Sequence, residues 1–275
     1  MIWFKGRNNT EPFTLFDTIR GVLNAINPAT TAIETSIANS LTAFSSTGFS
    51  VGTADQTGGG YNYSSWNWKA GGTPTATNSA GAGAVPTAGS VKIDGSNLGS
   101  ALAGTIAATK LSANTTAGMS IIEYEGNGVA GATVAHGLSQ APKMIIVKNI
   151  GTGSTDWAIY IGTGISDATD YWEFNTQTVG TTGAYWNDTA PTTSVFSIGN
   201  SAQVNTDTDN YIAYCFHEVE GYSKIGNYVG NGSVDGTFIY TGFRPSYFLA
   251  KWFSSGEAWE IQDNKRPGYN QTTMT

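Results

Sequence analysis

Short apolar runs separated by Gly, Asn, Asp and Thr recur along the chain at intervals of about ten residues. Residues 144–150 form a run of mostly branched apolar side chains that ends at Gly151, and residues 157–161 form a second run that ends at Gly162. Runs of this length bounded by turn residues predict β-strands, and two in succession predict a hairpin. Strands at this spacing are typical of a β-sandwich.

Residues 211–216 carry apolar side chains on both sets of alternate positions. One set is Tyr211, Ala213 and Cys215, and the other is Ile212, Tyr214 and Phe216. Since successive side chains of a strand point to opposite faces, this strand has two apolar faces. We therefore expect it in the middle of a sandwich, covered by aromatic side chains on both sides.

Residues 14–26 show a different spacing. Apolar residues stand at positions 15, 16, 19, 22, 23 and 26, which is close to the period of a helix. The pattern predicts one or two turns of helix in this first part of the chain, ended by Asn27 and Pro28.

Several stretches of the sequence recur, which indicates an internal repeat. Residues 118–128 return as 221–232 with one residue inserted, 136–148 as 241–251, 156–159 as 258–261, and 49–52 with 63–71 as 196–199 with 211–216. The repeating unit is about 100 residues long, far beyond the length of a solenoid repeat, so each unit is expected to be a domain.

The repeat divides the chain into three units. Residues 118–220 hold the complete pattern, residues 1–71 hold its later part without the first strands, and residues 221–275 hold its first half. On one interpretation the sequence is a fragment of a longer repeat protein. On the other, residues 221–246 of one subunit complete the first unit of another by strand addition, which predicts head-to-tail contacts.

Residues 72–117 separate the first two units and consist mainly of Gly, Ala, Ser and Thr. So few bulky residues cannot build a core alone. The interleaved apolar residues Val91, Ile93, Leu98, Leu102, Ile106 and Leu111 favour an extended arm that crosses a surface over a disordered linker.

Composition agrees with repeated antiparallel β-sandwich domains of jelly-roll or concanavalin-like type. Only 12% of the 275 residues are charged and 35 are Gly, which argues against a helical bundle, while 12% aromatic residues argue against disorder. The net charge of −7 argues against a nucleic-acid partner, and no apolar stretch is long enough for a membrane span. The one cysteine, Cys215, excludes a disulfide framework within the chain and is expected to be a small buried residue.

The residues that could carry chemistry are few. The two histidines, His136 and His217, show no spacing to a nucleophile and are expected to be surface or hydrogen-bonded side chains. Asp207 and Asp209 are expected to form an Asx-rich turn rather than a calcium loop, since no Gly and distant Glu accompany them.

Other carboxylates fit structural roles better than catalysis. Glu123 and Glu125 alternate on one strand and are expected on a solvated edge, and Asp17–Arg20, with its repeat Asp263–Arg266, is expected to be a local ion pair. We therefore predict no enzyme activity, and no catalytic, cofactor-binding or metal-binding residues.

Tryptophans offer the remaining candidate site. Trp66, Trp68, Trp172 and Trp186 could stack on sugar rings, although cross-strand packing explains such residues more often. Of these, Trp172 and Trp186 are the two residues proposed for glycan stacking.

Five stretches, in order, carry a likeness to a known family. Residues 41–52, 66–72, 101–116, 135–148 and 213–223 resemble the repeat-bearing virion structural proteins of marine tailed bacteriophages. The resemblance implies a fibre, decoration or tail-associated component that is made in the host cytoplasm and located in the virion. Its expected partners are copies of itself, as a homo-oligomer or head-to-tail polymer, and other virion proteins. The alternative is a receptor-binding adhesin that recognises a host cell-surface glycan through exposed aromatic residues.

Overall fold

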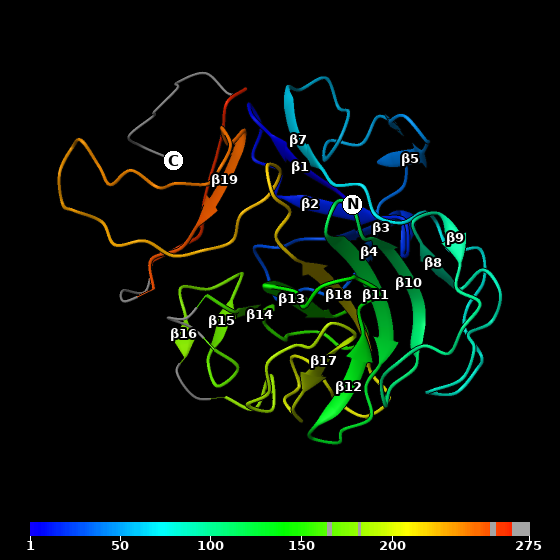
Figure 1. Ribbon diagram of the computed structural model, residues 1–275. Helices are drawn as coiled ribbons and strands as arrows, with labels where there is room; N and C mark the ends of the chain where they lie inside the picture. Colours follow the sequence, from blue (N-terminus) through cyan, green and yellow to red (C-terminus); the bar gives the residue numbers. More distant parts are fainter. Residues whose placement is uncertain (164–166, 181–182, 254–256, 266–275) are drawn as a thin grey trace.

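The protein is built from β-strands and loops, and the part of the chain described here contains no helix (Figure 1). The computed structural model describes residues 1–275 except 164–166, 181–182, 254–256 and 266–275. The strands of the first unit are β1 (Ile2–Gly6), β2 (Thr14–Asp17), β3 (Gly21–Ile26), β4 (Thr35–Ser36), β5 (Leu41–Phe44), β6 (Phe49–Val51) and β7 (Tyr63–Asn67). They are followed by β8 (Val91–Ile93), β9 (Ser96–Asn97), β10 (Ala108–Asn114), β11 (Met119–Glu125), β12 (Ala132–Ala135), β13 (Met144–Asn149), β14 (Ala158–Ile161), β15 (Tyr171–Glu173), β16 (Val179–Gly180), β17 (Val195–Ile198), β18 (Asn210–Phe216), β19 (Tyr247–Ala250) and β20 (Glu260–Asp263).

Two large sheets form the body of the molecule. The first has the order β4-β3-β2-β1-β7, and the second has the order β16-β15-β14-β13-β18-β11-β10-β8-β9. All their pairs are antiparallel except β8–β10. One face of the nine-stranded sheet packs against the β12–β17 pair, and its other face packs against the first sheet, as the two large hydrophobic clusters show. The fold is therefore all-β and layered, as the sequence pattern predicts.

The nine-stranded sheet confirms the two strand predictions made for this region. β13 and β14 form the expected hairpin, with Met144 opposite Ile161. β18 lies between β13 and β11, in the interior of the sheet. Its odd-numbered residues, including Cys215, belong to the cluster beneath β12–β17, and Ile212 and Tyr214 belong to the cluster shared with the first sheet. The strand is buried on both faces because each face has its own covering layer.

The first unit repeats the strand order of the second. In the first sheet β1 pairs with β2 and β7, just as β13 pairs with β14 and β18. The registers also agree, since Trp3 lies opposite Trp66 where Ile146 lies opposite Tyr214. The internal repeat read from the sequence is therefore a structural repeat as well.

The helix predicted over residues 14–26 is wrong. Residues 14–17 and 21–26 are the strands β2 and β3. Asp17 Oδ1 accepts hydrogen bonds from the amides of Ile19 and Arg20 at 2.9 and 3.0 Å, and Gly21 adopts a φ of +93°. These features make a tight turn between β2 and β3. Because the turn is short, the apolar residues of the two strands have a spacing in the sequence that resembles the period of a helix.

The arm over residues 72–117 is extended, but it is not separate from the second unit. β10 pairs with β11 along its length, and β8 and β9 extend the same sheet. Its six interleaved apolar residues are buried in, or packed against, the cluster between the nine-stranded sheet and β12–β17. The second unit therefore begins before residue 118, because hydrogen bonding to the β11 edge supplies the order that the arm's small side chains cannot.

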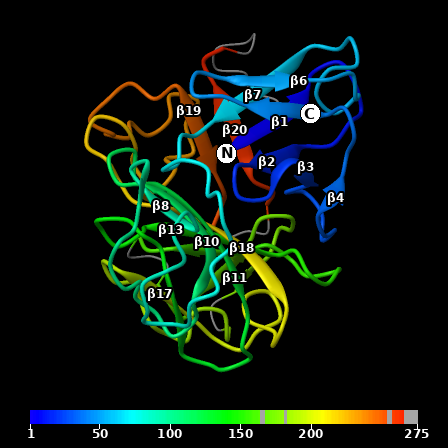
Figure 2. The ribbon, with the colours of Figure 1, turned by 90° about the vertical axis from the view of Figure 1, so that its right-hand side faces the viewer.

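The described residues of the third unit form a long loop and one hairpin. β19 and β20 pair with each other, with Tyr247 opposite Asp263. Figures 1 and 2 show this hairpin beside β1 and β7, and Tyr247 contacts the rings of Trp66 and Trp68. The three units thus meet around one centre, and the cluster between the two large sheets contains residues from each of them.

Candidate binding surface

A lysine and a tryptophan of the second unit hold a loop of the first unit. The Lys148 ammonium donates hydrogen bonds to the carbonyl oxygens of Thr31 at 2.9 Å and Thr155 at 2.8 Å. Nε1 of the fully buried Trp157 donates to the carbonyl of Thr30 at 3.0 Å. Burial lowers the pKa of Lys148 to about 8, so the ammonium remains mostly charged at neutral pH and bonds strongly to both carbonyls. The loop after β3 is therefore fixed to the second unit by two side chains.

The third unit makes the same contact with the second. The Lys251 ammonium donates to the carbonyl of Thr176 at 2.7 Å, and Trp259 Nε1 donates to the carbonyl of Glu173 at 3.1 Å. Lys251 and Trp259 occupy the repeat positions of Lys148 and Trp157. Their acceptors are Glu173, the last residue of β15, and Thr176, which follows β15 as Thr31 follows β3. Successive units therefore pack by one repeated contact.

A buried ionic network joins the first two units. Arg20 Nε lies 2.7 Å from Asp17 Oδ2, and both side chains are almost completely buried. The hydroxyl of Tyr214, from β18, donates to the same carboxylate oxygen at 2.7 Å. Burial alone would raise the pKa of Asp17, but the Arg20 charge, the Arg20 amide and the Tyr214 hydroxyl together hold it below its ordinary value. Asp17–Arg20 is thus the local ion pair expected from the sequence, with a partner from the second unit. Its repeat, Asp263–Arg266, includes Arg266, which lies outside the described residues.

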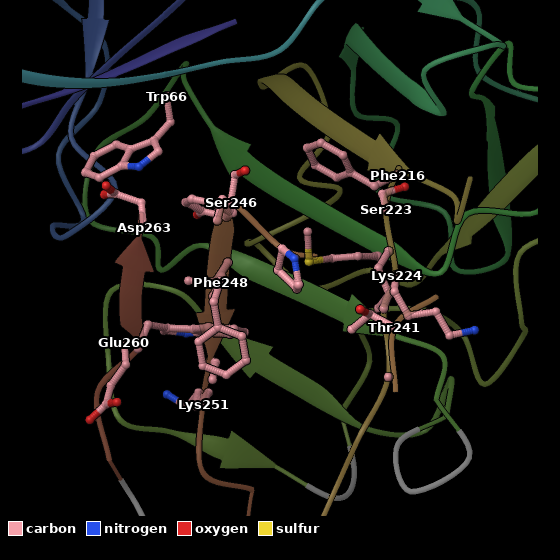
Figure 3. Close-up of a pocket in the computed structure, with 18 of the residues that line it drawn as sticks. Trp66, Phe216, Ser223, Lys224, Thr241, Ser246, Phe248, Lys251, Glu260 and Asp263 are labelled. Carbon is pink, nitrogen blue, oxygen red and sulfur yellow. The ribbon is translucent and has the colours of Figure 1, made fainter. Parts of the chain in front are cut away.

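A hollow of about 2110 Å³ lies between the third unit and the other two (Figure 3). Figure 3 shows Phe248 of β19 and Lys251, which follows β19, on one side and Ser223 and Lys224 on the other, with Trp66 above. Sites for single small molecules are typically about 300–1,000 Å³ and enclosed. The size and open shape of this hollow suit a segment of polypeptide better than a small ligand.

The third unit exposes large apolar side chains, most of which line this hollow. The strongly exposed ones are Tyr222, Tyr228, Val229, Val234, Phe238, Tyr240 and Trp252. Folded monomers rarely leave so many large apolar residues in one stretch of chain in water, and such patches usually mark interaction sites. The sequence indicates this surface only indirectly, through the repeat of residues 118–128 in residues 221–232.

The two tryptophans proposed for glycan stacking are buried. Trp172 is 5% exposed and packs against the rings of Phe253 and Trp259, and Trp186 is 1% exposed and packs edge-on against Tyr160. Neither face of these rings is open to a sugar. The prediction that these two residues stack on a glycan is wrong. The sequence of a strand does not show which other part of the chain will cover an aromatic side chain. The strongly exposed tryptophan among the described residues is Trp252, which the sequence analysis did not single out.

The histidines are in structural environments. His136 is buried, with Nε2 3.1 Å from the Thr192 carbonyl and Nδ1 accepting the Leu138 amide at 3.1 Å. His217 is also buried, with Nδ1 2.7 Å from the Glu218 carbonyl. The hydrogen-bonded role expected for both is confirmed.

The carboxylates singled out in the sequence also make local contacts. Glu123 pairs with Lys110 at 3.1 Å, and Glu125 is exposed at the end of β11. Asp209 Oδ2 accepts hydrogen bonds from Asn149 and Thr152 in the turn before β18. Within the described residues no three or more His, Cys, Asp and Glu side chains are placed to share a metal ion. Those residues also form no helix long and apolar enough to cross a membrane.

The His136 environment predicts a pH dependence of stability. Burial lowers its pKa from 6.5 to about 4, only partly offset by the Thr192 carbonyl. Between these values the unfolded chain binds a proton that the folded protein does not, so stability is lost as the pH falls from about 6.5 to about 4. The expected loss is about 3 kcal/mol. Urea unfolding at pH 7 and pH 4 should show it, and His136→Asn, which keeps an acceptor for the Leu138 amide, should lose less. Equal pH dependence of the two proteins would contradict this assignment.

The contact between units makes a prediction about Lys148. Lys148→Met keeps most of the aliphatic packing but leaves the Thr31 and Thr155 carbonyls without their charged donor. We expect the free energy of unfolding to fall by about 2 kcal/mol. The matched control is Lys5→Met, since Lys5 occupies the same repeat position but bonds the carbonyl of Glu11 in its own unit, near solvent. If urea unfolding shows equal losses in the free energy of unfolding for the two variants, the contact between units stabilises the protein no more than the contact of Lys5 within its own unit.

The fold and the contacts between units define an all-β repeat protein whose successive units pack by a repeated contact. The described residues of its third unit expose several large apolar side chains. The chain belongs to the family described as Domain of unknown function (DUF7483), which matches residues 1–94 and, separately, residues 92–275. The two matches meet in β8, which agrees with a second unit that includes β10. No curated protein and no solved structure matches the chain.

Proposed function

We propose that this protein is a self-assembling structural component of a virion, of the fibre, decoration or tail-associated kind that the sequence resemblance implies. Its role is to form an array through its β-sandwich units, with copies of itself and with other virion proteins as partners.

One observation carries the proposal: the units pack by the same lysine and tryptophan contact twice in one chain. Trp157 and Trp259 each donate to a carbonyl of the preceding unit, and so do Lys148 and Lys251. In this contact each unit uses one surface to bind a different surface of the preceding unit, which is a heterologous, head-to-tail arrangement. When contacts of this kind continue from one molecule to the next, they generate rings or filaments. The exposed apolar residues of the third unit supply a surface for that continuation.

Light scattering coupled to size-exclusion chromatography, followed by electron microscopy, tests self-assembly of the purified chain. The expected result is a mass that rises with protein concentration and ordered oligomers or filaments in the images. A monomer at every concentration would contradict the proposal.

The exposed aromatic residues of the third unit favour a second candidate, a glycan-binding adhesin. Trp252 and Tyr240 are 60% and 80% exposed, so their rings are accessible to a sugar in a way that those of Trp172 and Trp186 are not. A glycan array with the Trp252→Ala variant as control separates the two candidates. Saturable binding that is lost in the variant favours the adhesin, whereas no binding together with concentration-dependent assembly favours the structural role.

A further inference from the structure

The outer edge of β7 is open among the described residues. β7 pairs with β1 alone in its sheet. The Trp68 amide bonds the Met1 carbonyl and the Arg7 amide bonds the Asn62 carbonyl, so the even-numbered peptide groups of β7 face β1. The peptide groups of Tyr63, Ser65 and Asn67 consequently face away from the sheet. A strand edge of this kind is a template for pairing with another chain.

The second unit shows what covers the equivalent edge. There β18 pairs with β13 through its even-numbered residues, since the Ile150 amide bonds the Asn210 carbonyl. Its odd-numbered residues pair with β11, since the His217 amide bonds the Gly118 carbonyl. The repeat places Tyr63, Ser65 and Asn67 at the positions of Tyr211, Ala213 and Cys215. In the second unit, β11 covers this edge of β18. In the first unit, the equivalent edge of β7 has no strand beside it among the described residues.

The chain holds a second copy of the β11 sequence. Residues 221–232 repeat residues 118–128, so that Ser223, Ile225 and Tyr228 stand at the positions of Ser120, Ile122 and Tyr124. In the second unit these three β11 residues lie opposite Cys215, Ala213 and Tyr211. The register for a strand added to β7 follows directly: Ser223 opposite Asn67, Ile225 opposite Ser65 and Tyr228 opposite Tyr63, with the inserted residue in a β-bulge.

This second copy forms no strand within the described structure. Beyond the single bridge between Val219 and Ser223, residues 224–246 take part in no sheet. Tyr228 is 49% and Val229 85% exposed. The segment therefore has the sequence of an interior strand in the environment of a surface loop.

We infer that residues 223–229 of one molecule pair as an added antiparallel strand with the β7 edge of a second copy of this chain. The inference deepens the proposed self-assembly and rests on it. The contact is head-to-tail, because the third unit of one copy pairs with the first unit of the next, and the same contact can repeat along the array.

The contacts of the segment favour a second copy over closure onto its own β7. Ile225 donates its amide to the Glu218 carboxylate at 3.1 Å, Lys224 pairs with the same carboxylate, and Asn227 donates to the Thr163 carbonyl at 2.9 Å. Both partners belong to the second unit, so the segment is held along that unit, and the hollow separates it from the β7 strand of its own chain. Pairing with a neighbouring molecule exchanges the bonds of the Ser223 peptide group to Val219, and that of the Ile225 amide to Glu218, for bonds to β7, while the Asn227 contact can remain.

Disulfide trapping between molecules tests the inference. The Ser65→Cys and Ile225→Cys variants are prepared separately and mixed under mild oxidation. Directly opposite strand positions lie about 5.5 Å apart at Cα, within disulfide range. We expect a covalent dimer in the mixture, formed on the order of a hundredfold faster than in either variant alone, because pairing raises the effective thiol concentration. Ser65→Cys mixed with Val234→Cys, whose thiol lies outside the pairing segment, is the matched control. The native Cys215 is buried and stays in all variants.

A second measurement uses the unmodified protein, so that it does not depend on the folding of a variant. A synthetic peptide of residues 221–232 should compete for β7 and lower the mass of the oligomers, and a scrambled peptide should not.

The possible outcomes separate the inference from the proposed function. Equal dimer formation with the Val234→Cys control, or no effect of the peptide on oligomers that do form, overturns this pairing and leaves self-assembly standing. A double variant Ser65→Cys/Ile225→Cys that closes into a monomeric disulfide, with no dimer in the mixture, overturns the second copy in favour of closure within one chain. A protein that remains a monomer at every concentration contradicts both the strand pairing and the proposed self-assembly.

Discussion

Arg20→Met should destabilise the protein by about 3–5 kcal/mol, because it removes the charged partner of a carboxylate that stays buried. Arg20 also donates to the carbonyls of Asn24 at 2.9 Å and Leu15 at 3.2 Å, so these acceptors lose their donor as well. The pKa of Asp17 should rise in the variant, since burial then acts with less opposition. Urea unfolding at neutral pH measures the loss.

Lys224→Met is the control for this prediction. It removes an ion pair with Glu218 at 3.1 Å in which the lysine is half exposed, and such pairs are worth about 0–1 kcal/mol. If Arg20→Met and Lys224→Met cost the same, the buried network between the first two units does not stabilise them in the way described.

Trp157→Ala should cost about 3–5 kcal/mol, the range for truncating a large buried aromatic side chain. Trp157 is 0% exposed, packs beside Phe174 and holds the Thr30 carbonyl of the first unit. The loss should appear in denaturant unfolding and should increase proteolysis of the loop after β3, since that loop also depends on this contact.

Two related variants show how much of this loss comes from ring packing, how much from the hydrogen bond, and how much from the position of the tryptophan in the protein. Trp157→Phe keeps a ring and loses the donor, so we expect a smaller loss than for Trp157→Ala. Trp259→Ala removes the equivalent contact of the third unit, where the ring is only partly buried, and should also cost less. A Trp259→Ala loss as large as that of Trp157→Ala would contradict the view that burial of the tryptophan ring sets the strength of this contact.

Strands could be predicted from the sequence where the alternation of apolar side chains along a short segment shows which faces of the strand are buried. The alternation in residues 211–216 predicts a strand covered on both faces, and the structure places β18 in that position. The repeat predicted the common strand order of the first two units. These features depend on local periodicity and on comparison of the chain with itself.

The features that the sequence does not predict depend on side-chain capping or on contacts between distant segments. The turn after Asp17 uses a side chain to cap backbone amides, which the helical spacing of residues 14–26 conceals. The arm is ordered by the edge of β11, a strand that follows it in the sequence. Trp172 is buried partly by Phe253 and Trp259 from the third unit, so its burial could not be read from residues 118–220 alone.

Backbone hydrogen exchange followed as a function of protein concentration tests directly whether copies assemble by pairing residues 223–229 with β7. If they do, peptides covering residues 63–67 and 223–229 become more protected together as the concentration rises. Peptides covering residues 211–216, which are already paired on both sides, should show no change. Protection of residues 63–67 and 223–229 that does not vary with concentration would contradict the account.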